Sequence, residues 1–139
     1  MNRDAASDTT NADASAEVDA VFSALSDVHR RYTLYYLRDR GSATVDELAT
    51  VLASWLGTRD DPAAVVTPED RQRLRTELDD AHLPKLADLA FVRYDAKTGD
   101  VSVEPLPELV ETILDVSLEQ QRERPNQPDN RSFDWYTGR

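Results

Sequence analysis

The sequence has no cysteine, which excludes disulfide bonds, thiolate metal sites and cysteine nucleophiles. Lysine is nearly as scarce, because Lys85 and Lys97 are the only two in the chain. No apolar run approaches the roughly 18 residues that a membrane-spanning helix needs, and the polar start of the chain lacks the apolar core of a signal peptide. We therefore expect a soluble protein of the cytoplasm.

Acidic residues dominate the charge of the chain. Asp and Glu number 27 against 16 Lys and Arg, which gives a formal net charge of -11. Dense carboxylates hold water and counterions, and molar salt shortens the range of their mutual repulsion to about 3 Å. The composition therefore favours a protein from a halophilic cell. An acidic protein of a mesophile is the alternative.

Polar composition predicts a tail at each end of the chain. Residues 1–15, "MNRDAASDTTNADAS", contain no aliphatic side chain larger than alanine apart from Met1, so we expect a disordered acidic N-terminal tail. Residues 123–139 are rich in Pro, Asn and Asp, which predicts a flexible C-terminal tail. This second tail carries an aromatic motif that either folds back onto the domain or docks on a protein partner, namely Phe133, Trp135 and Tyr136.

Between the tails, residues 16–122 have the length and the apolar periodicity of one helical domain. Apolar spacing predicts helices over about 18–26, 28–38, 45–56, 68–81 and 107–122. A residue suited to N-capping stands before three of them: Asp27, Thr44 and Thr67.

Three local signals complete the predicted elements. Thr44 with Glu47 forms a capping-box pattern. Pro84 cannot donate a hydrogen bond to the preceding turn, so the fourth helix must kink or restart there. Strands are predicted at about 91–95 and 100–104, joined by "DAKTGD", which suits a turn with Gly99 in the left-handed conformation. A loop at 57–67 separates the third and fourth helices.

Four helices, a two-stranded wing and a last helix is the order of the ArsR-type winged helix-turn-helix domain. The stretches "ALSDVHRRYTLYYLRDRG", "TVDELATVLASWLG" and "LPKLADLAFVRYD" resemble that family's opening, its first helix-turn-helix element and the end of its recognition helix. More closely, "LYYLRDRG", "TVDELA" and "HLPKLADLAFVRYD" are similar to a family of winged-helix proteins from haloarchaea. The resemblance implies a mainly α fold with a small β-hairpin and an additional C-terminal helix, acting as a DNA-binding transcriptional regulator. It departs from the ArsR metal sensors, whose helices carry thiolates that this chain lacks.

The resemblance places the DNA contacts on the fourth helix and the wing. The candidate residues there are Arg71, Gln72, Arg73, Arg75, Lys85, Arg93 and Lys97. At 100° per residue, Arg71 and Arg75 share one face of the helix and Arg73 points away from both. Acidic residues are interleaved with these cations. The alternative is therefore an ordinary solvated helix, with pairs such as Arg73 to Glu77 and Arg75 to Asp79.

No pattern in the sequence predicts an enzyme or a cofactor. The carboxylates are evenly spread and there is no glycine-rich phosphate loop. His29 and His82 are the only histidines and lie far apart in the sequence, so we interpret both as structural and expect no metal site. Four aromatic residues are expected in the core with their polar groups at its rim: Tyr32, Tyr35, Tyr36 and Trp55.

The last predicted helix is apolar over more of its circumference than packing against one neighbour requires. The resemblance implies a homodimer through the first and last helices, with the candidate contacts Val21, Leu25, Leu114 and Leu118. Extra packing within one chain is the alternative. We therefore expect a homodimeric regulator that binds double-stranded DNA, and the rival is a protein-interaction module on a winged-helix scaffold that does not bind DNA.

Overall fold

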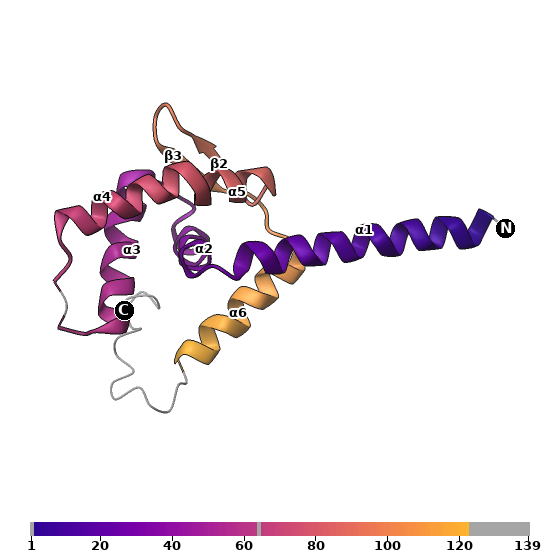
Figure 1. Cartoon of the computed structure of the whole chain (residues 1–139), viewed down its shortest axis with the longest axis horizontal. Helices are drawn as coiled ribbons and strands as arrows, with labels where there is room; N and C mark the ends of the chain where they lie inside the picture. Colours follow the sequence, from indigo (N-terminus) through magenta and orange to yellow (C-terminus); the bar gives the residue numbers. More distant parts are fainter. Residues whose placement is uncertain (1, 64, 123–139) are drawn as a thin grey trace.

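The computed structural model describes residues 2–63 and 65–122, which form a mainly helical fold with a small three-stranded antiparallel sheet (Figure 1). A π-helical turn, η1, joins α4 to α5. The elements in chain order are α1 (Asn2–Leu25), α2 (Val28–Arg40), β1 (Ser42–Thr44), α3 (Val45–Asp60), α4 (Pro68–Glu77), η1 (Leu78–His82), α5 (Leu83–Asp88), β2 (Val92–Asp95), β3 (Asp100–Val103) and α6 (Glu108–Arg122).

The helix α2 forms the centre of the core, with α1, α3 and α6 arranged around it (Figure 1). Tyr32 and Tyr35 are both 1% exposed, and their rings pack 5.4 Å apart. The hydroxyl of Tyr35 lies 2.5 Å from the Ser117 hydroxyl on α6, and the hydroxyl of Tyr36 donates to Glu47 on α3. The prediction that these tyrosines are core residues with hydroxyls at the rim is confirmed.

The predicted helix starts are mostly confirmed. Thr67 accepts a hydrogen bond from the Asp70 N–H (3.1 Å) while Asp70 accepts one from the Thr67 N–H (3.3 Å), which closes a capping box at the start of α4. Thr44 accepts from the Glu47 N–H at 3.1 Å. The second half of that predicted box is wrong, because Glu47 turns to the hydroxyl of Tyr36 instead of the Thr44 N–H.

The sheet has one strand more than the sequence predicted. β3 lies in the middle, and Val101 pairs with Ala43 of β1 on one side and with Tyr94 of β2 on the other. β1 has three residues, too few for an alternating apolar pattern to show in the sequence. Gly99 has φ 81° in the hairpin turn, as predicted, and its carbonyl accepts from the Val45 N–H at 2.8 Å.

Pro84 restarts the fourth helix in the way predicted, by means of the turn η1. α4 ends at Glu77, the five residues of η1 follow, and Pro84 is the second residue of α5. The Leu83 N–H reaches back five residues to the Leu78 carbonyl, a wider turn than that of an α-helix. This turn brings His82 into the interior, where it is 8% exposed.

The start of the chain is helical in the structure. α1 begins at Asn2, so the stretch 2–15 that was expected to be disordered is helical here and extends away from the other elements (Figure 1). An α-helix satisfies its backbone hydrogen bonds locally, and the alanines of this stretch favour it. The aromatic motif of residues 123–139 lies outside the described residues.

α3 continues to Asp60, which shortens the predicted 57–67 loop. Within residues 2–63 and 65–122, no helix combines the length and the apolar character needed to cross a membrane.

Candidate functional site

The helix α4 separates its polar residues onto two faces. Leu74 is buried against the core. Arg71 and Arg75 lie on the side that faces the start of α3, where both reach the same carboxylate, and Gln72 and Arg73 are exposed to solvent. The prediction that Arg71 and Arg75 share a face from which Arg73 diverges is therefore confirmed.

The carboxylate shared by the two arginines belongs to Asp46, in the first turn of α3. Arg75 Nε lies 2.6 Å from Asp46 Oδ1, and Arg71 Nη2 lies 3.5 Å from the same oxygen. Arg71 also donates from Nε to the Thr50 hydroxyl at 2.7 Å. The hydrogen bond from Arg75 holds the pKa of Asp46 below its usual value. The pairing with Asp79 that the sequence suggested for Arg75 is thus replaced by a contact 29 residues away.

Arg73 also differs from its suggested partner. Its guanidinium lies 3.4 Å from Asp70, one turn earlier on α4, and not against Glu77. The side chain of Arg73 is 68% exposed, so this pair is open to solvent. Gln72 beside it is exposed as well. The exposed residues of α4 therefore include one guanidinium and one amide among the carboxylates of Glu69, Asp70 and Glu77.

Three further cations lie on α5 and the hairpin. Lys85 is exposed on α5. Arg93 on β2 is 76% exposed and lies 3.4 Å from Glu104. Lys97 is exposed in the hairpin turn, where its N–H donates to Asp95 at 2.9 Å. α4, α5 and the hairpin, the elements that carry these cations, lie along one side of the molecule (Figure 1).

A partly buried contact links the hairpin to the turn η1. The hydroxyl of Tyr94 on β2 donates to Asp79 Oδ1 at 2.5 Å. Burial and this hydrogen bond raise the pKa of Tyr94 to about 12. The phenol is therefore neutral at physiological pH and remains a donor.

The residues expected at a dimer interface are largely inside one chain. Val21 and Leu25 are each 4% exposed and Leu114 is fully buried, while Leu118 is partly buried against the same core. α6 packs against α2. The large apolar side chains left exposed on α1 and α6 are Val18, Phe22, Leu109 and Val116.

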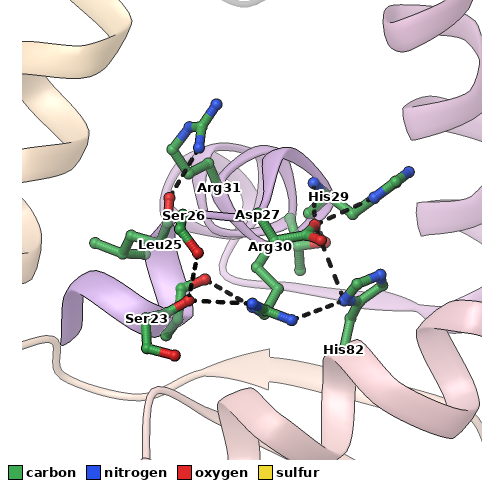
Figure 2. Close-up of polar contacts among 10 residues, drawn as sticks. Ser23, Leu25, Ser26, Asp27, His29, Arg30, Arg31 and His82 are labelled. Carbon is green, nitrogen blue, oxygen red and sulfur yellow. Dashed lines mark hydrogen bonds and ion pairs between the residues drawn. The ribbon is translucent and has the colours of Figure 1, made fainter. Parts of the chain in front are cut away.

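The two histidines, far apart in the sequence, come together at the junction of α1 and α2. Their rings stack with centroids 5.1 Å apart, and the side chain of Asp27 lies beside both (Figure 2). One potential ligand atom from each of Asp27, His29 and His82 lies within 4.8 Å of the other two. These three residues could hold a metal ion, an arrangement that sequence separation concealed.

Comparison with known proteins gives one family. A family model described as Domain of unknown function (DUF7344) matches residues 22–102, which is more than half of the chain. The match runs from the end of α1 through β3 and so covers α4 and the hairpin. No curated protein and no solved structure matches the chain.

Proposed function

Because the chain belongs to the family described as Domain of unknown function (DUF7344), we propose a function from its geometry, namely that of a DNA-binding transcriptional regulator with a winged helix-turn-helix fold. α3 and α4 correspond to the helix-turn-helix, and the β2–β3 hairpin to the wing. The order β1-β3-β2 with α3 inserted after β1 supports this reading. In such folds the second helix of the pair enters the major groove.

The observation that carries the proposal is the pair of arginines held on Asp46. Both guanidiniums reach from α4 to the carboxylate of Asp46 at the start of α3, and the side chain of Asp46 is 58% exposed. Exposed ion pairs of this kind contribute little to stability. A DNA phosphate can therefore replace the carboxylate as partner of Arg71 and Arg75 without disturbing the fold.

The remaining contacts follow from exposure. Gln72 and Arg73 point outward from α4 and would reach base edges, where amide and guanidinium groups make bidentate hydrogen bonds. Lys85, Arg93 and Lys97 would hold the flanking phosphates. The acidic composition supports work in a salt-rich, halophilic cytoplasm, where phosphate contacts alone cannot hold the complex because they weaken steeply with salt.

A homodimer completes the proposal. The exposed apolar residues Val18 and Phe22 on α1 and Leu109 and Val116 on α6 are its contact surface, in place of the core residues expected from the sequence. The same exposed residues are the observation that favours the rival function, a protein-interaction module that does not bind DNA.

Selection from a pool of random double-stranded DNA, followed by fluorescence anisotropy across a salt series, tests the proposal. Arg71→Ala with Arg75→Ala should weaken binding and reduce the slope of log affinity against log salt by about 1.8 per protomer, since each phosphate contact contributes roughly 0.9. Arg59→Ala is the matched control, because Arg59 lies at the far end of α3, roughly 20 Å along the helix from Asp46. If no duplex is enriched, the DNA proposal fails and the interaction module stands.

A further inference from the structure

The junction of α1 and α2 concentrates polar contacts around one carboxylate. Asp27 is the N-cap of α2, and its Oδ1 accepts the His29 N–H at 2.7 Å. The same oxygen lies 3.2 Å from His29 Nδ1 and 4.0 Å from His82 Nδ1 (Figure 2). Burial acts to raise the pKa of Asp27, but the hydrogen bond from the His29 N–H and the nearby histidines outweigh it and leave the pKa lowered. The carboxylate is therefore an anion that faces both imidazoles.

Hydrogen-bond donors already contact two of the three possible ligand atoms. Arg30 Nη1 lies 3.1 Å from His82 Nδ1. Because a guanidinium can only donate, His82 Nδ1 is the acceptor and carries a lone pair. His29 Nδ1, facing the carboxylate, is the proton donor of its contact with Asp27. The Arg30 hydrogen on His82 Nδ1 and the proton on His29 Nδ1 thus occupy the lone-pair positions that a metal ion would need.

From this geometry we infer that Asp27, His29 and His82 bind a divalent transition-metal ion of the zinc class, which takes the place of the His29 proton and of the Arg30 hydrogen bond. Two imidazoles and one carboxylate are a set that such ions accept, with a fourth position left for water. Tetrahedral coordination at about 2.1 Å sets ligand atoms about 3.4 Å apart. The three atoms lie within 4.8 Å of one another, so side-chain rotation brings them to that spacing.

The surroundings permit both the exchange and the access. Arg30 donates from Nε to the Ala24 carbonyl at 2.6 Å and from Nη2 to the Ser23 carbonyl at 3.2 Å, so its side chain keeps two contacts with α1 after losing His82. Burial lowers the pKa of His82, which leaves the imidazole neutral as a metal ligand must be. The side chains of His29 and Asp27 are 28% and 33% exposed, so an ion can reach them from solvent.

The site would join two parts of the fold. Asp27 and His29 stand at the start of α2, and His82 is the last residue of η1. A bound ion would therefore cross-link the α1–α2 junction to the segment between α4 and α5. Metal binding here does not depend on whether the chain binds DNA.

Zinc titration of the whole chain, produced without a histidine tag, tests the inference. Because the chain has two histidines, long-range ¹H–¹⁵N spectra show two imidazoles, which single His variants assign. Excess Mg²⁺ is kept present to occupy the carboxylates of the acidic surface. We expect one equivalent of Zn²⁺ to shift both imidazoles and to raise the melting temperature, since the ion binds the folded state.

Variants separate the cluster from general cation binding. His29→Gln and Asp27→Asn should each weaken Zn²⁺ binding at least tenfold in calorimetry, and Asn keeps the N-cap of α2. Glu119→Gln, which removes an exposed carboxylate from α6, should change nothing. Arg30→Gln should tighten binding several-fold, because it removes the competing charge. His29 is partly exposed, so its variant decides the matter even if a His82 variant fails to fold. Unshifted imidazoles, or affinity unchanged in His29→Gln, would overturn the inference.

Discussion

Replacement of Asp46 by asparagine isolates the role of the arginine pair on α4. Asparagine keeps the size of the side chain but removes the charge that holds Arg71 at 3.5 Å and Arg75 at 2.6 Å. If both arginines turn to phosphates in the DNA complex, the carboxylate is left facing DNA and repels it. Asp46→Asn should therefore bind DNA more tightly than the native chain.

The size of the effect follows from Coulomb's law. A guanidinium that lies between the carboxylate it has left and the phosphate it binds sets the two anions roughly 6 Å apart, and in water this repulsion changes a dissociation constant about threefold. Two copies in a dimer give roughly tenfold. Screening shortens the interaction from about 10 Å at 0.1 M salt to about 3 Å at 1 M, so the gain should fade as salt rises.

The control must remove the same charge elsewhere. Asp61→Asn does so, because Asp61 is exposed at the opposite end of α3. Anisotropy with one duplex at 0.1 M and 1 M salt compares the two variants with the native chain, and circular dichroism confirms that each remains folded. Equal affinities for Asp46→Asn and Asp61→Asn would show that Arg71 and Arg75 do not contact phosphate, and the reasoning would fail.

Three other results are expected. Tyr94→Phe should lower the free energy of unfolding by about 1–2 kcal/mol in urea denaturation, because the Asp79 carboxylate loses its donor. The native pKa of Tyr94 is about 12 against an ordinary 10.0, so the native chain should lose this stabilisation as pH rises from 10 to 12, while Tyr94→Phe shows no such loss. Phe22→Glu with Val116→Glu should give monomers in light scattering with an unchanged helical spectrum, since both side chains are more than half exposed; a persisting dimer would place the interface elsewhere. Lowering salt from molar to tens of millimolar should reduce the melting temperature, and a melting curve indifferent to salt would remove the argument for a halophilic cell.

Features that depend on neighbours in the sequence were predictable. The N-caps at Thr44 and Thr67, the left-handed Gly99 and the restart at Pro84 each follow from a few adjacent residues. The division of the arginines between two faces of α4 follows from helical geometry alone. Such features need no knowledge of the tertiary fold.

Contacts between distant segments were not predictable in the same way. Asp46 lies in the first turn of α3, where an acid favours a helix start, and nothing local marks it as the partner of Arg75, 29 residues later. His29 and His82 met because η1 turns the second histidine inward. For Leu114 the periodicity showed an apolar face, but not that the core of the same chain buries it.

The hairpin is fastened to the rest of the molecule at both of its ends. The Gly99 carbonyl accepts the Val45 N–H at 2.8 Å, and the Val103 N–H donates to the Gly41 carbonyl at 3.0 Å. A Cβ at position 99 would lie 3.2 Å from Val45 Cγ1, so the turn sits closely on the first residue of α3. The hairpin and α3 therefore hold a fixed distance and orientation relative to each other. A partner that touches both must bend or shift to match that distance, and little conformational entropy is left for the protein to lose on binding.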